Sequence, residues 1–256
     1  MTSTTTPPID WVRDPESIPW IEENDPPDIS HLVIEDDAPV DNLIQEKQQR
    51  LLVDCLYSSL QSEAPFLAAA NVGLFYGLHL PALVPDVMLS LGVSVAADWH
   101  QRRHRSYFVW EFGKPPDVAI EIVSNQKGNE LGSKLTHYAQ AGVTYYAVFD
   151  PLQQLTEESV LQVFALREGS YYCLEQPRMP PINLGFTLWE GEFEGKSFPW
   201  LRWQDSEGRL LLTGNERAEQ EYQRAEQEYQ RAEQERQRAD RLASLLHAQG
   251  IDPDQG

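Results

Sequence analysis

Apolar and polar positions alternate with clear periods between residues 43 and 203. In "NLIQEKQQRLLVDCLYSSLQ" the apolar residues Leu52, Cys55, Leu56 and Leu60 recur at helical spacing, which predicts a first helix. "PDVMLSLGVSV" opens with Pro85 and predicts a strand, and the aromatic and β-branched run "RSYFVWEFG" predicts another. The polar, basic stretch "DWHQRRHRS" between them predicts a loop.

The middle of the chain predicts a strand–helix–strand unit. "DVAIEIVS" reads as a buried strand, "SNQKGN" as a loop, and "ELGSKLTHYAQAG" as a helix that ends at Gly142. "VTYYAVFDP" then predicts a second strand. A strand–helix–strand unit of this length implies parallel neighbouring strands and a right-handed crossover. A hairpin from "VLQVFAL" and "SYYCLEQ" and further short strands rich in Trp and Gly follow, so the pattern predicts an α/β fold.

The pattern changes to a seven-residue repeat after about residue 215. "RAEQEYQ RAEQEYQ RAEQERQ RADRLAS" is rich in strong helix formers and predicts a long polar helix. Its 4-3 spaced seam is that of a coiled coil, although it is built mainly from alanine and is interrupted by Arg236. We expect a long helix here, and we expect residues 215–246 to bind either a second copy of the chain or another protein.

Composition divides the chain into three parts. Residues 1–40 hold ten Asp and Glu and only one basic residue, Arg13, and we interpret them as an acidic, Pro-rich N-terminal arm. Residues 41–210 contain the predicted globular domain, and residues 211–256 the Glu/Arg/Gln-rich heptad-repeat helix and tail.

The formal net charge is −20, which argues against unspecific attraction to nucleic acids or anionic membranes. Between residues 80 and 140, however, six Asp and Glu face six Lys and Arg, so the segment that carries the candidate chemistry is neutral. No stretch has the length of a membrane span, and the start lacks a signal peptide. Cys55 and Cys173 match no zinc or redox spacing and lie among apolar residues, so we expect two buried thiols and a cytoplasmic location.

One residue of the central strand breaks its apolar pattern. Because side chains alternate along a strand, Glu121 shares a face with the apolar Ala119 and Val123. A lone buried carboxylate is costly and either protonates or recruits a cation. The simple explanation is a salt bridge or a solvent-facing edge, and the functional explanation is a metal ligand or a general base.

A lysine lies close to the apolar stripe of the helix that follows. Lys134 falls at helical spacing with Leu131, Tyr138 and Ala141. Taken alone, such a lysine extends its ammonium to solvent. A helix packed on its preceding strand would, however, carry Lys134 over Glu121, and two opposite charges within one unit are more informative than either alone.

A third candidate, Asp86, follows Pro85 at the start of the earlier strand. Proline followed by aspartate is ordinary at a strand start and carries weight only together with Glu121 and Lys134. Two carboxylates suit Mg²⁺, which polarises a phosphate and lowers the pKa of a bound water, and a lysine stabilises the developing negative charge. These three residue types in this order therefore suit metal-dependent phosphodiester cleavage.

The block "PPDVAIEIVS…GSKLTHYAQAGVTYYAVFDP" resembles the signature of the restriction-endonuclease family called Uma-two, in the PD-(D/E)XK nuclease superfamily. The resemblance spans about residues 40–205 and rests on the pattern E-V/I-x-S…K-x-x-x-Y-x-x-x-G-V…D-P. It implies a restriction-endonuclease-like α/β core, in which a mixed sheet has helices on both sides, and a Mg²⁺-dependent endonuclease that cuts DNA as a homodimer, with Mn²⁺ as a substitute. Carried onto this chain, Asp86 and Glu121 are the metal-binding catalytic acids and Lys134 is the catalytic lysine.

Two features depart from the superfamily pattern. The usual lysine position, two residues after the second acid, holds Val123, and the family pattern places the lysine on the helix instead. A long insert carries the basic stretch "HQRRHR", whose arginines either reach a phosphate backbone or form a solvated turn; we favour the turn.

Two further classes of function compete with a nuclease. The charge, the acidic arm and the repeat suit a catalytically inactive nuclease fold that acts as a binding or assembly module through its C-terminal coiled coil. A small-molecule α/β enzyme finds little support, since the sequence has no glycine-rich phosphate loop and no G-x-S-x-G elbow.

Overall fold

The computed structural model describes residues 42–124, 129–155 and 159–248. The predicted acidic arm and most of the loop after the central strand lie outside the described residues. The predictions made for these segments are therefore not tested by the fold.

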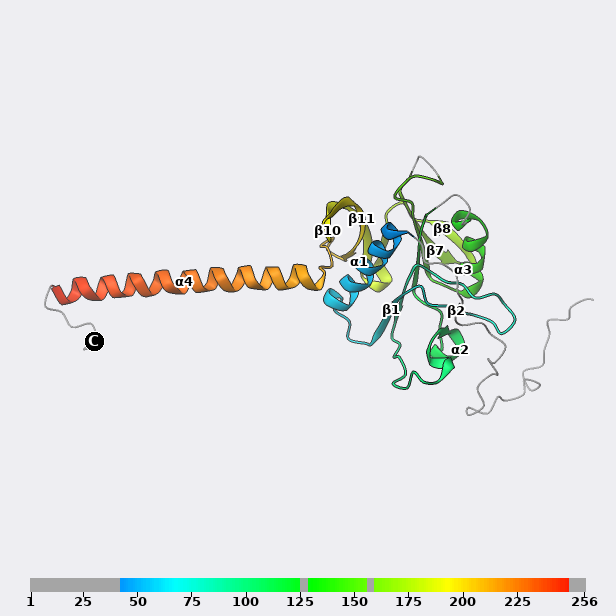
Figure 1. Cartoon of the computed structure of the whole chain (residues 1–256), viewed down its shortest axis with the longest axis horizontal. Coiled ribbons are helices and arrows are strands. Elements are labelled where there is room, and N and C mark those ends of the chain that lie inside the picture. The colour runs from blue at the N-terminus through cyan, green and yellow to red at the C-terminus, as the bar shows by residue number, and fades with distance from the viewer. Residues whose placement is uncertain (1–41, 125–128, 156–158, 249–256) are drawn as a thin grey trace, which may run out of the picture. The chain divides into compact units, whose positions relative to one another are not determined.

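A mixed six-stranded sheet forms the centre of the domain (Figure 1). Its strands lie in the order β1-β3-β5-β6-β7-β8, and their neighbours are antiparallel except for the parallel pair β5 and β6. Their bounds are Phe66–Ala70 for β1, Val87–Leu91 for β3, Val118–Ile122 for β5, Tyr145–Phe149 for β6, Leu161–Arg167 for β7 and Ser170–Cys173 for β8.

The parallel pair β5–β6 of this sheet confirms the predicted strand–helix–strand unit. Between β5 and β6 the chain forms a π-helical turn, Glu130–Lys134, and the helix α3, Leu135–Ala141. Gly142 ends α3 with a φ of 80°, a left-handed conformation that glycine adopts without steric cost. The β7–β8 hairpin is also as predicted.

Both faces of the sheet are covered, so β5 and β6 are buried along their whole length. The helix α1, Leu43–Ser59, lies on one face with Leu51, Leu52 and Leu56 in the larger apolar cluster. The helix α3 lies on the other face, where Tyr138 and Ala141 pack in a second cluster (Figure 1). The buried, near-continuous apolar composition of these strands follows from this double cover.

The C-terminal strands form a long hairpin rather than the predicted series of short strands. Strands β10, Leu184–Phe193, and β11, Lys196–Asp205, pair over their whole length. Strand β9, Arg178–Met179, pairs with the start of β10 and is joined to it by a short turn that includes the 3₁₀ helix Pro180–Ile182. The hairpin packs its tryptophans Trp200 and Trp203 into the α1 side of the core.

The predicted strand "RSYFVWEFG" is largely wrong. Only β4, Tyr107–Phe108, is extended, and it pairs in parallel with β2, Leu74–Phe75. The chain then turns into the short helix α2, Val109–Phe112, which brings the rings of Tyr107 and Phe112 to 4.2 Å in a stack. Five residues of strand would separate these rings by about 17 Å, so aromatic packing overrides the local β propensity.

The predicted long helix is present as α4, Gly214–Ala248. Thr213 and Glu216 begin it with reciprocal hydrogen bonds, because Glu216 Oε2 accepts from Thr213 N–H at 2.7 Å and Thr213 Oγ1 accepts from Glu216 N–H at 3.2 Å. The guanidinium of Arg202, which is fully buried, donates to both oxygens of Glu216 at 3.0 and 2.7 Å. The first turn of α4 is therefore anchored to strand β11.

One of the two cysteine predictions is wrong. Cys55 is buried on α1, but Cys173 is exposed at the end of β8. Strand β8 is an edge strand that pairs only with β7 in the central sheet, so its side chains are less covered than those of the inner strands. Among the described helices, none combines the length and apolar character that crossing a membrane requires.

Candidate active site

Glu121 is buried at the centre of the molecule, on the α3 face of β5. It is 3% exposed, between the buried side chains of Ala119 and Val123. The strand that places it there consists of Val, Ala and Ile, and every one of its five residues is buried. The sequence pattern therefore correctly predicts that this carboxylate lies inside the protein.

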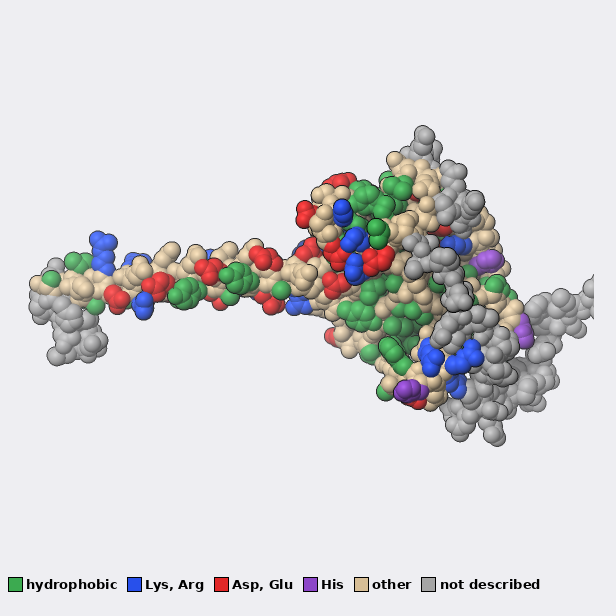
Figure 2. All heavy atoms as spheres, in the orientation of Figure 1, with side chains coloured by type: hydrophobic (Ala, Val, Ile, Leu, Met, Phe, Trp, Pro, Cys, Tyr) green, Lys and Arg blue, Asp and Glu red, His purple; other side chains and the backbone are tan. Residues whose placement is uncertain are grey.

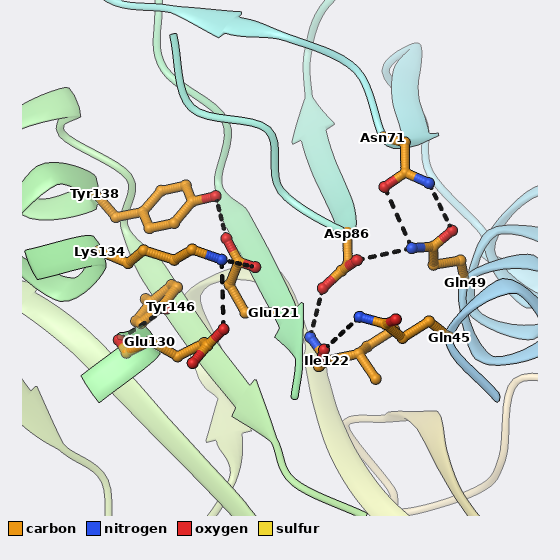
Figure 3. A network of polar contacts seen from close by, with 10 residues as sticks. All are labelled: Gln45, Gln49, Asn71, Asp86, Glu121, Ile122, Glu130, Lys134, Tyr138 and Tyr146. Carbon is orange, nitrogen blue, oxygen red and sulfur yellow. Dashed lines mark hydrogen bonds and ion pairs between the residues drawn. The ribbon is translucent and has the colours of Figure 1, made fainter. Parts of the chain in front are cut away.

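Two side chains from the following helical segment reach both oxygens of Glu121 (Figure 3). The ammonium of Lys134 lies 2.9 Å from Oε2, and the hydroxyl of Tyr138 donates to Oε1 at 2.6 Å. Lys134 and Tyr138 lie one turn apart, which puts them on the same side of the helical segment. The expectation that the helix carries Lys134 over Glu121 is met.

A second carboxylate faces the same ammonium. Glu130, four residues before Lys134, is 5% exposed, and its Oε1 lies 3.5 Å from the Lys134 Nζ. The turn that holds both residues is kinked at Gly132, where a Cβ would come within 2.0 Å of the Asn129 side chain. Tyr146 of β6 donates from its hydroxyl to the Glu130 backbone carbonyl at 3.0 Å and fixes the start of this turn.

Burial dominates the electrostatics of the cluster. It raises the pKa of Glu121 to about 7, and the nearby charge of Lys134 offsets only part of this effect. Burial also lowers the pKa of Lys134, but Glu121 and the neighbouring carboxylates outweigh it and leave that pKa above its ordinary value. Burial and the charge of Glu121 raise the pKa of Tyr138 well above 10, so Tyr138 serves as a hydrogen-bond donor.

Asp86 precedes β3, the strand next to β5, and is 5% exposed. Its Oδ1 accepts from Gln49 Nε2 at 2.7 Å, and its Oδ2 accepts from the backbone N–H of Ile122 at 2.6 Å. These bonds hold the carboxylate beside the end of β5 (Figure 3), where its charge contributes to raising the pKa of Glu121. Asp86 and Glu121 thus come from neighbouring strands, but their hydrogen bonds run to opposite sides of the sheet.

Sequence reasoning missed a polar row on α1 that supports this arrangement. Gln49 also exchanges hydrogen bonds with the Asn71 side chain at 2.9 and 3.3 Å, and Gln45 donates to the Ile122 carbonyl at 2.8 Å. Gln45 and Gln49 follow the same helical stripe as Leu52 and Leu56, so glutamines at buried stripe positions are a signal that the sequence contained.

The basic loop is held by its own contacts. Arg103 pairs with Glu111, and Arg105 donates to the Trp99 and His100 carbonyls at 2.9 and 3.0 Å. These bonds suit the turn interpretation of "HQRRHR", with Arg102–His104 forming a 3₁₀ turn, better than an arm that reaches a phosphate backbone.

Residues 33–188 match the Uma2 family, whose description is "Putative restriction endonuclease". The chain belongs to the Uma2 family. The match covers more than half of the chain and includes all three predicted site residues, and it confirms the family resemblance carried by the "VAIEIVS…K…Y…G" block.

The crystal structure of a "putative nuclease belonging to DUF820" from Anabaena variabilis also matches this Uma2 chain. It is 19% identical, with a TM-score of 0.40, over 56% of this chain and 76% of that one. None of the curated proteins matches. The predicted fold class, a mixed sheet flanked by helices with a long C-terminal helix, is confirmed.

The donor set of this Uma2 chain fits a hard divalent cation. Asp86, Glu121 and Glu130 offer only oxygen ligands, and Glu130 Oε2 is buried without a hydrogen-bond partner. Within the described residues, no three Asp, Glu, His or Cys already form a group that could hold an ion. Mg²⁺ keeps several waters and commonly takes only one or two carboxylates, so it does not require a preassembled group of three.

Proposed function

We propose that this Uma2 protein is a Mg²⁺-dependent endonuclease that hydrolyses phosphodiester bonds of DNA. Family membership supports a nuclease function. The observation that carries the proposal is the ion pair between Glu121, 3% exposed, and Lys134, whose side chain remains 34% exposed. A buried acid in contact with a solvent-accessible ammonium provides a cation-binding carboxylate beside a group that a phosphate can reach.

Each side chain has a distinct role in this proposal. Asp86 and Glu121 would hold the metal, with Asp86 oriented by Gln49 and the Ile122 N–H, and Glu121 by Tyr138. When bound, Mg²⁺, or Mn²⁺ in its place, supplies polarisation of the phosphate and a lowered pKa for water. The ammonium of Lys134 stabilises negative charge that develops during the attack on phosphorus.

The decisive experiment compares four proteins on supercoiled plasmid DNA with Mg²⁺, with Mn²⁺ and with EDTA. We expect wild type and Glu194→Gln to cut only with metal, and Glu121→Gln and Lys134→Ala to lose at least about a hundredfold in rate. Glu194 is a suitable control because it is also an ion-paired carboxylate. It lies on the β10–β11 turn and is paired with Lys47 and Arg50 of α1. Equal cutting by wild type and Glu121→Gln would refute the proposal, and RNA in parallel reactions tests the choice of substrate.

The alternative function is a binding or assembly module, and the surface of α4 favours it. The seam residues Tyr222 and Tyr229 are each 68% exposed, and Figure 2 shows hydrophobic and acidic side chains interspersed along α4. By helical geometry the seam is flanked on both sides by acids, which are Glu219, Glu226, Glu233 and Asp240 on one side and Glu221, Glu228 and Glu235 on the other.

This charge pattern favours a partner helix with basic flanks over a second copy of α4. In a homodimer through this seam, acids would oppose acids in either orientation. The test uses a synthetic helical peptide with a Leu seam and Lys flanks. In this alternative the wild type shows no metal-dependent cutting of DNA or RNA, and it binds the peptide until residues 218–256 are deleted.

The homodimer and the cytoplasmic location expected from the sequence remain proposals. The acidic flanks of α4 oppose a dimer through its seam, so a dimer of the nuclease would have to use another surface. Light scattering of the full chain, and of the chain that ends at residue 217, measures whether two copies associate and whether α4 is needed.

A further inference from the structure

Glu130 is not one of the three proposed site residues, but it lies beside them and its carboxylate has fewer hydrogen-bond partners than that of Asp86 or Glu121. Its side chain is 6% exposed, and Lys134 at 3.5 Å is its ion-pair partner. Its second oxygen, Oε2, is buried and has no hydrogen-bond partner within the described part of the chain. A buried carboxylate oxygen without a hydrogen-bond partner is destabilising, so it marks a position that a ligand would satisfy.

The position of Glu130 is fixed rather than accidental. The Tyr146 hydroxyl holds its backbone carbonyl at 3.0 Å, and the kink at Gly132 directs Glu130 and Lys134 toward the same space as Glu121. Figure 3 shows the Glu130 and Glu121 carboxylates meeting at the Lys134 ammonium, whereas Asp86 points toward α1.

The charges of the cluster are also unbalanced. Glu121 and Glu130 share the single ammonium of Lys134, and Asp86 adds a further nearby charge, so with all three acids ionised the cluster carries an excess of two negative charges. A divalent cation would balance this excess, and oxygen donors are those that Mg²⁺ and Mn²⁺ prefer.

We propose that Glu130 is a further carboxylate of the metal site, and that it gives an oxygen to the divalent cation alongside Glu121. The inference rests on the proposed function, because it concerns the same cation. It assigns the unpaired Oε2 a ligand, and it adds to the sequence motif an acid that lies four residues before the lysine.

The test measures binding of Mn²⁺ alone to the full chain by calorimetry and by the electron paramagnetic resonance signal of free Mn²⁺. We expect Glu130→Gln to weaken binding by at least about tenfold, the scale on which loss of even an outer partner weakens a metal site. Glu194→Gln should bind within about twofold of wild type. Wild-type affinity in Glu130→Gln would overturn the inference.

Two further variants separate the possible failures. If Glu121→Gln also binds Mn²⁺ as wild type does, the whole proposed site is wrong; if only Glu121→Gln loses binding, the role of Glu130 alone is wrong. A Lys134→Met background distinguishes ligation from an indirect effect through the lysine. If adding Glu130→Gln to this background weakens Mn²⁺ binding further, direct ligation by Glu130 is supported. If it leaves Mn²⁺ affinity unchanged, the inference is overturned. Circular dichroism without metal confirms that each variant is folded.

Discussion

Replacing Lys134 with methionine should destabilise the metal-free protein in a way that grows with pH. The substitution keeps an unbranched side chain of similar length but removes the one charge among the described residues that lowers the pKa of Glu121. Within that part of the chain Glu121 then has no cationic partner and, being 3% exposed, little contact with water. We therefore expect its pKa to rise further above its wild-type value of about 7.

The sign follows from proton linkage. A folded-state pKa above the unfolded value of 4.5 favours the fold at low pH, and this contribution is lost as pH rises through the folded pKa. In the wild type the loss ends near pH 7, because Glu121 then ionises in both states. In Lys134→Met the carboxyl stays protonated, so the loss continues at about 1.4 kcal/mol per pH unit.

Unfolding in urea, followed by tryptophan fluorescence in EDTA, measures this difference. The gap in unfolding free energy between wild type and Lys134→Met should widen by up to about 3 kcal/mol between pH 7 and pH 9. Lys196→Met, at an exposed lysine that begins β11, should show no such widening. A gap that is the same at both pH values would mean that Glu121 ionises without Lys134, and the account of the buried pair would be refuted.

Three other predictions concern the supports of the site and the ends of the domain. Gln49→Leu removes the hydrogen bond from Gln49 to Asp86 Oδ1 and the two bonds between Gln49 and Asn71, and should cost about 2–5 kcal/mol in urea unfolding. Gln223→Leu, on the exposed part of α4, should cost under about 0.5 kcal/mol. Burial raises the pKa of Glu216, but its bonds to Arg202 and Thr213 lower it more. The contribution of Glu216 to stability is therefore present above pH 4.5 and is lost as pH falls through the folded pKa. The melting temperature of Glu216→Gln should accordingly depend less on pH between about pH 5 and pH 3 than that of wild type. A thiol reagent should label Cys173 at once and Cys55 only on unfolding, because burial raises the pKa of Cys55 to about 12; two fast thiols would contradict this.

The sequence predicted best where one residue broke a strong local pattern. Glu121 within "VAIEIV" and Lys134 near an apolar stripe were conspicuous, and the parallel β5–β6 pair follows from the strand–helix–strand spacing. The glutamines of α1 stood at stripe positions that the pattern marks as buried, but their partners lie 22 to 77 residues away, so the pattern could not show what they bind.

The same limit explains the errors. The "RSYFVWEFG" segment has strand-like residues, but its rings satisfy each other across a helical turn. Cys173 sits among apolar neighbours in sequence, yet its strand lies at an edge that only the sheet order reveals. Glu130 appears in sequence as one acid among many, and only its burial with an unpaired oxygen sets it apart.

The ion pair between Arg202 and Glu216 in the first turn of α4 affects how the domain unfolds. Arg202 has no exposed surface, and it also lies 4.8 Å from the Trp189 ring and donates to the Leu211 carbonyl at 2.8 Å. Separating Glu216 from Arg202 would leave a buried guanidinium without its carboxylate partner. The first turn of α4 and the β10–β11 hairpin should therefore unfold as one cooperative unit. A protease that digests the exposed repeat would then stop at the first turn of α4 and leave the globular domain intact.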